Sequence, residues 1–170
     1  VLEVHLEHAA LECEVRDGRA VPTDQPTPRW FFTSRIPSLE AAVGAAIEGE
    51  ELWRSLILAP DAFGTFPPTD GAGYHVAGVP VVNLLAAPFY LFDKMDTLDK
   101  IDRDHLVPIT RATIRIIESM RSETAAGLRA QLEAAPAWTP DFALPERVAG
   151  ARWVEPTLVA AVRYREWIDS

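Results

Sequence analysis

Cysteine and lysine are nearly absent from this chain. Of its 170 residues one is cysteine, Cys13, and only Lys94 and Lys100 are lysine. A single cysteine excludes an internal disulfide framework and a cysteine-based structural zinc site. Cys13 is also a poor candidate nucleophile, because its acidic neighbours Glu12 and Glu14 are expected to raise the pKa of the thiol.

Long apolar runs are absent as well. The longest candidate, residues 79–90, is interrupted by Pro80, Asn83 and Pro88 and is too short for a membrane span. The sequence does not open with the basic, then apolar, then small-residue pattern of a secretory signal. We therefore expect no membrane partner and favour the cytoplasm as the location of the protein.

Basic residues are outnumbered by acidic ones. Sixteen lysines and arginines face twenty-five aspartates and glutamates, which gives a net charge of -9. Broad contact with a phosphate backbone requires clustered basic side chains, so this balance argues against a nucleic-acid partner. The content of 48% hydrophobic and 24% charged residues is that of a globular protein and excludes a disordered or collagen-like chain.

What the sequence does contain is an alternation of strand-like and helix-like segments up to residue 121, which predicts an α/β fold. Residues 1–15 alternate as strand, and Asp17-Gly18 predicts a hairpin turn into a short strand over 19–21. The apolar segment 81–85 is typical of an interior strand that is covered on both faces. The other expected strands are 29–33 and 55–59, and the expected helices are 38–53, capped by Ser38, 105–121, capped by Asp104, and 123–135.

Three residues of the opening strand have metal-binding chemistry. Because residues i and i+2 of a strand point to one face, His5 and Glu7 are expected to project together while His8 faces away. An imidazole beside a carboxylate suits Zn²⁺, which takes nitrogen and oxygen ligands. A solvated or hydrogen-bonded strand face explains the same residues without a metal ion.

Two loops carry further polar groups. Residues 69–75 set glycines around Asp70 and end in His75, so this loop either brings an Asp or His that binds a metal ion or polarises water, or is an ordinary Gly-rich turn. The second loop carries aspartates without the glycine and the bidentate glutamate of a calcium loop, which favours a solvated, helix-capping role. These aspartates are Asp93, Asp96, Asp99, Asp102 and Asp104.

These loops contain two motifs, the first of which sets Asp70 at a fixed distance from Gly78-Val79-Pro80. They read Thr69-Asp70-Gly71-x-x-Tyr74-x-x-x-Gly78-Val79-Pro80 and Asp96-Thr97-x-Asp99. Through them, residues 1–121 resemble the C-terminal half of the M28 family of zinc aminopeptidases. The resemblance implies a partial α/β/α sandwich with a mixed sheet, a zinc site at the strand ends, and a peptide or small-molecule substrate.

The resemblance also implies roles for particular residues. Glu7 matches the strand-end carboxylate that binds zinc in the family, and His75 and His5 are weaker candidate ligands. The position of the family's final histidine ligand holds Phe92, and the other ligands and the general base are expected upstream of Val1. The substrate cleft is expected to be lined by Asp70, Gly71, Tyr74, Tyr90, Phe92 and Asp96.

The remainder of the chain differs in composition. Residues 122–146 are expected to form a short helix and a Pro-rich linker. Residues 147–170 contain Arg152-Trp153-Val154-Glu155-Pro156 and resemble the first strand of the OB-fold domain of bacterial ATP-dependent DNA ligases. An amphipathic terminal arm is the alternative for this tail.

Three functions follow as hypotheses. The first is a zinc aminopeptidase-like hydrolase region that is incomplete or inactive alone, and the second is a non-catalytic α/β binding or structural module of the same ancestry. The third is a nucleic-acid-binding fragment related to DNA ligases. Because half a sheet leaves an unpaired edge, either a homo-oligomer or a missing upstream half is expected as partner.

Overall fold

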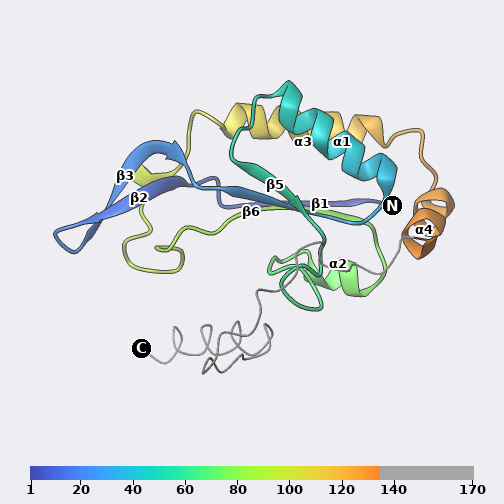
Figure 1. Cartoon of the computed structure of the whole chain (residues 1–170), viewed down its shortest axis with the longest axis horizontal. Coiled ribbons are helices and arrows are strands. Elements are labelled where there is room, and N and C mark those ends of the chain that lie inside the picture. The colour runs from blue at the N-terminus through green and yellow to red at the C-terminus, as the bar shows by residue number, and fades with distance from the viewer. Residues whose placement is uncertain (135–170) are drawn as a thin grey trace, which may run out of the picture.

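A four-stranded mixed sheet forms the centre of the molecule (Figure 1). The computed structural model describes residues 1–134, so the Pro-rich part of the expected linker and the tail 147–170 lie outside the described residues. In spatial order the strands are β1 (Glu3–Glu7), β6 (Val81–Ala86), β4 (Arg29–Thr33) and β5 (Ser55–Leu58). β1 is parallel to β6 and β4 to β5, whereas β4 and β6 are antiparallel. The predicted α/β class with a mixed sheet is therefore confirmed.

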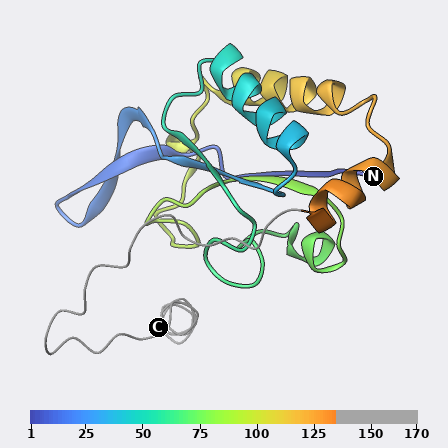
Figure 2. The ribbon, with the colours of Figure 1, turned by 45° about the vertical axis from the view of Figure 1, so that its right-hand side comes forward.

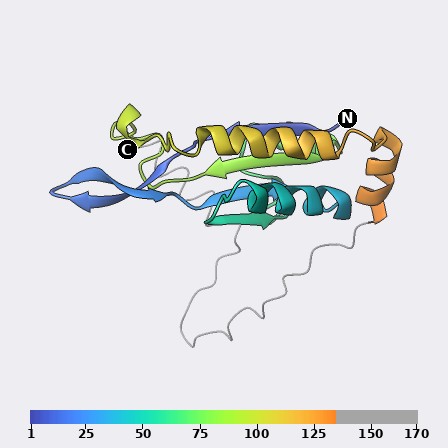
Figure 3. The same cartoon turned by 90° about the horizontal axis from the view of Figure 1, so that it is seen from above.

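The two long helices, α1 (Pro37–Gly49) and α3 (Leu106–Ser119), lie over one face of this sheet (Figures 1 and 3). Their apolar side chains pack with Phe31, Val82 and Leu84 of the sheet in one buried core. The short helix α2 (Ala72–Val76) and the loop before it lie on the opposite side, as Figure 2 shows. Within residues 1–134, no helix combines the length and the apolar character needed to cross a membrane.

The interior strand was predicted correctly. All six residues of β6 are buried, because β1 and β4 flank the strand and both of its faces are covered. This arrangement explains why its sequence is a nearly continuous apolar run rather than an alternation. The one polar residue in the run, Asn83, is therefore buried as well.

The opening segment, whose alternation breaks between Leu6 and Leu11, forms two separate strands and not the one expected. β1 ends at Glu7, and β2 (Leu11–Arg16) leaves the sheet to form a separate hairpin with β3 (Arg19–Pro26), which projects from the molecule in Figure 3. His8 has a φ of 55°, a left-handed conformation that breaks the strand. β3 is longer than predicted because a two-stranded ribbon has free edges on both sides, where proline is tolerated.

The expected helix caps were wrong. α1 begins at Pro37, without a capping hydrogen bond from Ser38, since proline itself favours the first turn of a helix. The residue before α3 is His105 rather than Asp104, and it too makes no side-chain capping bond. The third expected helix is present as α4 (Ala125–Ala134).

A buried ion pair connects the sheet to α3. Arg29 of β4 donates from Nη2 to Oδ2 of Asp102 at 2.6 Å, and both side chains are 2% exposed. Arg29 also donates to the carbonyl of Trp53 at 3.1 Å, and Nδ1 of His105 lies 2.7 Å from Oδ1 of Asp102. The pair therefore fixes β4, the segment before β5 and the start of α3 relative to one another.

This ion pair generates a prediction for stability. Asp102→Ala is expected to lower the free energy of unfolding by about 3–5 kcal/mol, because it leaves the Arg29 charge buried without a partner. Glu14→Ala is the control: it removes an exposed pair with Arg16 and is expected to cost less than about 1 kcal/mol. Urea denaturation measures both values, and equal losses for the two variants would contradict the prediction.

Candidate metal centre

Three polar side chains follow one another along one face of β1. Glu3, His5 and Glu7 alternate with apolar residues, so all three point away from the face that packs against α1 and α3. The parallel register places His5 beside Asn83 and Glu7 beside Leu85 of β6. The prediction that His5 and Glu7 project together is confirmed.

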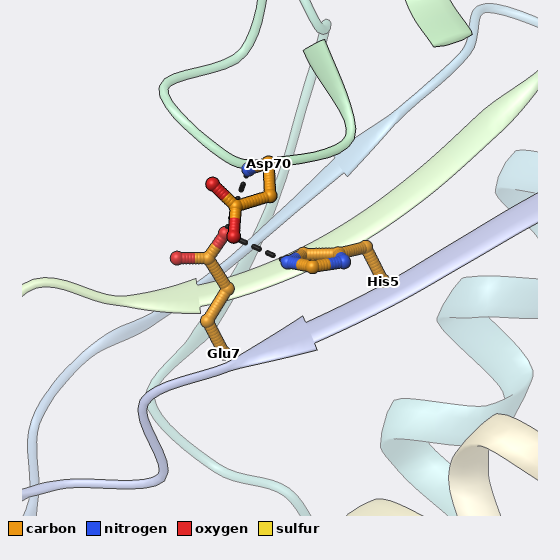
Figure 4. Close-up of side chains that lie close together, drawn as sticks. All are labelled: His5, Glu7 and Asp70. Carbon is orange, nitrogen blue, oxygen red and sulfur yellow. Dashed lines mark hydrogen bonds and ion pairs between the residues drawn. The ribbon is translucent and has the colours of Figure 1, made fainter. Parts of the chain in front are cut away.

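His5 and Glu7 meet Asp70, which comes from the loop before α2 (Figure 4). Nε2 of His5 lies 2.9 Å from Oε1 of Glu7, and the backbone N–H of Asp70 donates to that same oxygen at 3.0 Å. One possible ligand atom from each residue lies within 4.8 Å of the others. His5 and Glu7 are half-buried and Asp70 is exposed, so the group lies at the surface where a solute can reach it.

The loop that carries Asp70 is held against the sheet by Asn83. The buried amide of Asn83 accepts a hydrogen bond from Oγ1 of Thr69 at 2.7 Å and donates one to Oε2 of Glu3 at 2.6 Å. Gly71 passes so close to this amide that a Cβ atom at position 71 would collide with it. The glycine is therefore required by close approach, and it brings the loop down onto β6.

Glu3 is a further acidic side chain close to His5. Oε1 of Glu3 lies 4.0 Å from Nδ1 of His5, on the opposite side of the ring from Glu7. Burial raises the pKa of the Glu3 carboxyl, while the hydrogen bond from Asn83 and the nearby His5 act in the opposite direction. At 4.0 Å the two groups interact through charge and not through a hydrogen bond.

His8 does not face away as the strand pattern predicted. Because β1 ends at Glu7 and His8 adopts a positive φ, Nε2 of His8 lies 3.2 Å from Oε2 of Glu7. The Phe92 ring packs against His8 in an edge-on arrangement with the ring centroids 6.0 Å apart. Glu7 consequently has an imidazole on each of its two oxygens.

A pocket of about 270 Å³ opens beside His8. Its wall is mostly apolar, and it includes Tyr90 and Asp96, two of the residues expected in the substrate cleft, together with Lys100. The hydroxyl of Tyr90 donates to the carbonyl of Leu11 at 2.5 Å, and burial raises its pKa. The Tyr90 hydroxyl therefore already has a hydrogen-bond partner, and the aromatic ring is the part of Tyr90 that can contact a ligand in the pocket.

The other expected site residues lie apart from this group. Tyr74 is exposed and His75 half-buried on α2, and neither belongs to the one group of potential metal ligands found in residues 1–134. Phe92 is 80% exposed and contacts the candidate centre only through His8. Of the three candidate ligands, the structure brings His5 and Glu7 together and leaves His75 outside.

The aspartate-rich loop and Cys13 are two further candidates that the sequence offered. Asp102 belongs to the buried pair with Arg29, and the aspartates of its loop form no group of three potential metal ligands within residues 1–134. Burial raises the pKa of the Cys13 thiol, which is the expected direction, although burial rather than Glu12 and Glu14 is the main cause. Neither residue therefore has the surroundings of a catalytic group.

Sequence reasoning missed part of this centre. Asp70 was expected to line the substrate cleft, in a loop that can bind a metal ion, but its meeting with His5 and Glu7 was not predicted, nor were the contributions of Glu3, His8 and Asn83. Two signals were available in the sequence: Glu3 shares the i, i+2 spacing of His5 and Glu7, and Asn83 interrupts an apolar strand. A polar group in a buried strand requires hydrogen-bond partners, so it marks a place where another segment must approach.

Comparison with known proteins adds no assignment. No protein-family model, no curated protein and no solved structure matches the chain. A functional assignment therefore depends on the residues described above and on the motif resemblance of residues 1–121.

The contact between Gly71 and Asn83 generates a prediction. Gly71→Ala is expected to lower the free energy of unfolding by about 1–3 kcal/mol, because the new methyl group displaces the loop from β6. Gly73→Ala is the control, since a Cβ there meets no atom within 4 Å and alanine favours the helix. Thermal denaturation of both variants checks this, and a Gly71→Ala protein as stable as Gly73→Ala would contradict it.

Proposed function

We propose that residues 1–121 form the C-terminal half of a zinc-dependent, aminopeptidase-like hydrolase, in which His5, Glu7 and Asp70 bind one metal ion. The observation that carries this proposal is the convergence of the three side chains within 4.8 Å at the carboxyl end of β1. One imidazole and two carboxylates are ligands that Zn²⁺ accepts, and three protein ligands leave a position for water or substrate.

The residues fit a metal ion chemically. Two carboxylates and an imidazole lie together, and the ionisable partners of Glu7 are two histidines, His5 at 2.9 Å and His8 at 3.2 Å. A divalent cation would balance both carboxylates. The backbone N–H of Asp70 already holds the Glu7 carboxylate in place. When bound, such an ion lowers the pKa of a coordinated water molecule.

Uncovered surfaces support the interpretation as one half of a domain. β1 lies at an edge of the sheet, has no strand on its outer side within residues 1–134, and leaves Leu6 43% exposed. α3 exposes Val107, Ile114 and Ile117 at helical spacing, while its Arg111 and Arg115 bind Glu50 next to α1. Strands added beside β1 would cover these side chains and supply the ligands and general base that the resemblance implies.

The pocket beside His8 is the proposed site for part of the substrate. Its apolar residues include Pro88, Leu91, Ile101 and Leu106, so it suits an apolar side chain of a peptide or small molecule. His8 lines this pocket and its Nε2 lies 3.2 Å from Oε2 of Glu7, which supports a substrate position near the proposed metal ion. Asp96 provides one negative charge at its wall.

A non-catalytic module of the same ancestry is the second candidate. Phe92 occupies the position of the family's final histidine ligand, and its phenyl ring provides no metal ligand. A nucleic-acid function would depend on residues 147–170, which lie outside the described residues. The zinc-loaded chain tests for catalysis by the chain itself: hydrolysis of aminoacyl 4-nitroanilides that is lost in Glu7→Gln supports the hydrolase, whereas bound zinc without hydrolysis excludes independent catalysis and supports either a binding module or an incomplete half.

The proposed metal site generates a prediction. The purified full chain is expected to bind about one Zn²⁺ ion, and Glu7→Gln is expected to weaken this binding at least ~10-fold because amide oxygen replaces a charged ligand. Isothermal titration calorimetry with zinc chloride measures the affinity. Glu14→Gln, which changes an exposed glutamate of β2, is the control and should bind zinc as the unchanged chain does. Absence of zinc binding in the unchanged chain would contradict the proposal.

A second prediction concerns Glu3, which touches His5 but is not one of the three ligands. Glu3→Gln is expected to weaken zinc binding by less than about 10-fold, because it removes a negative charge 4.0 Å from His5 while the three ligands remain. The same calorimetric titration measures this effect, and circular dichroism checks that the fold is retained. Unchanged affinity would show that the charge of Glu3 does not contribute to zinc binding.

A further inference from the structure

The outer edge of β1 has no strand partner in the part of the chain that the structure describes, where β1 pairs only with β6. The N–H of Glu3 donates towards β6, to the carbonyl of Pro80 at 3.0 Å. Because successive N–H groups of a strand point in opposite directions, those of Val4 and Leu6 point to the open edge. An edge of this kind pairs with another segment unless it is protected.

The two faces of the sheet differ in chemistry along this edge. On one face lie the carboxylates of Glu3, Glu7 and Asp70. Within residues 1–134 the ion pairs of Glu3 and Glu7 are with histidines alone, so no lysine or arginine there balances these charges. On the other face Leu6 is 43% exposed, below the apolar side chains that α3 exposes over the β1 side of the sheet (Figure 3). A strand that fits this edge therefore has a basic face and an apolar face.

Residues 157–165 carry this pattern in their sequence. They follow Pro156 and contain neither proline nor glycine, and they include threonine, valine and tyrosine, which favour strands. Arg163 and Arg165 are two residues apart, so a strand would place both on one face. The alternate residues, which would share the opposite face, are Leu158, Ala160, Val162 and Tyr164.

We infer that residues 157–165 pair with β1 as a fifth strand of the sheet and place Arg163 and Arg165 beside the carboxylates of the candidate metal centre. The apolar face of this strand then covers Leu6 and the side of α3 above it. A slip of one residue would exchange the two faces and set arginine against leucine, so the two chemistries together select the alignment.

Charge favours this segment as the occupant of the edge. Carboxylates that lose water when a strand covers them need a positive partner, and guanidinium groups form strong hydrogen bonds with them. The opposite edge of the sheet does not offer the same partner, since β5 (Ser55–Leu58) contains no charged residue. The arginines therefore distinguish β1 from β5.

The connection is long enough for this pairing. The structure describes the chain up to the end of α4, which lies next to the N-terminus in Figures 1 and 2. Fully extended, residues 135–156 span up to roughly 70 Å. The five residues of β1 extend over only about 17 Å. Residues 157–165 can therefore reach either end of β1 and pair in either direction.

The pairing would hold the candidate centre closed. Its guanidinium groups supply the positive charge that a metal ion would otherwise supply, and its backbone takes the edge that the proposed upstream half requires. The segment is thus a competitor of both zinc and added strands. The competition with zinc rests on the proposed function, whereas the pairing with β1 does not.

Hydrogen exchange of the full, metal-free chain, followed by NMR, tests the pairing. The amide protons of Val4 and Leu6 are expected to exchange slowly in the unchanged chain. Val162→Asp is expected to accelerate both at least ~10-fold, because it places a charge on the apolar face of the added strand. Val148→Asp makes the same change outside residues 157–165 and is expected to leave both rates unchanged. The amide proton of Leu84, in the interior strand β6, is expected to remain slow in every variant and reports that the sheet is intact.

Calorimetric titration with zinc chloride tests where the arginines lie. Arg163→Gln combined with Arg165→Gln is expected to raise the zinc affinity several-fold, because the competing guanidinium groups are removed. Arg147→Gln combined with Arg152→Gln removes the same charge outside the segment and is the control. If no variant binds zinc, the proposed function is contradicted, while slow exchange at Val4 that Val162→Asp abolishes still supports the pairing.

Four results would overturn the inference. Fast exchange of Val4 and Leu6 in the unchanged chain would show that the edge is open. Slow exchange that persists in Val162→Asp would show that another segment covers it, and protection that is lost on dilution would show that the covering strand comes from a second copy. Zinc binding that is equal in the unchanged chain and in the double glutamine variant at positions 163 and 165 would show that these arginines do not lie at the carboxylates.

Discussion

The candidate centre depends on one buried amide. Asn83 lies in the middle of an apolar strand that is covered on both faces, and a polar group there must form hydrogen bonds or cost about 1–3 kcal/mol. Its partners are Thr69, which begins the loop over the sheet, and Glu3, at the start of β1. By forming these hydrogen bonds, Asn83 positions the loop that brings Asp70 to Glu7. The geometry of the candidate metal centre therefore follows from the hydrogen bonds that the buried Asn83 of β6 forms.

A second buried polar contact positions the other side of the centre. The Arg29–Asp102 pair fixes the segment before α3, and the backbone N–H of Asp102 donates to the carbonyl of Ala9 at 3.0 Å. This bond holds the chain after β1 next to the loop that carries Asp96, so a pocket forms beside His8. Asn83 on β6 and Arg29 on β4 therefore position the two loops that contain the sequence motifs, one carrying Asp70 and the other Asp96.

Periodicity and turn residues predicted most elements, because strands and helices depend on local patterns that each segment carries by itself. They could not predict that β2 leaves the sheet, since this depends on the positive φ of His8, nor that proline starts α1 without help from Ser38. The candidate site was predictable where it follows strand alternation, as for His5 and Glu7. That Asp70 lies beside His5 and Glu7 could not be predicted, because the position of its loop depends on the hydrogen bond from Thr69 to Asn83, which comes fourteen residues later in the sequence.

The two edges of the sheet differ in chemistry, and this difference separates two kinds of association. The β1 edge carries carboxylates and imidazoles on one face, so strands added there would remove water from His5, Glu7 and Asp70. Two carboxylates that lose water require a compensating positive charge, so completing the sheet at β1 would increase the affinity for a cation. The β5 edge carries the uncharged Ser55 and the exposed apolar Leu56 and Ile57, whose burial needs no compensating charge. Covering the β1 edge therefore requires a cation beside its carboxylates, and covering the β5 edge does not.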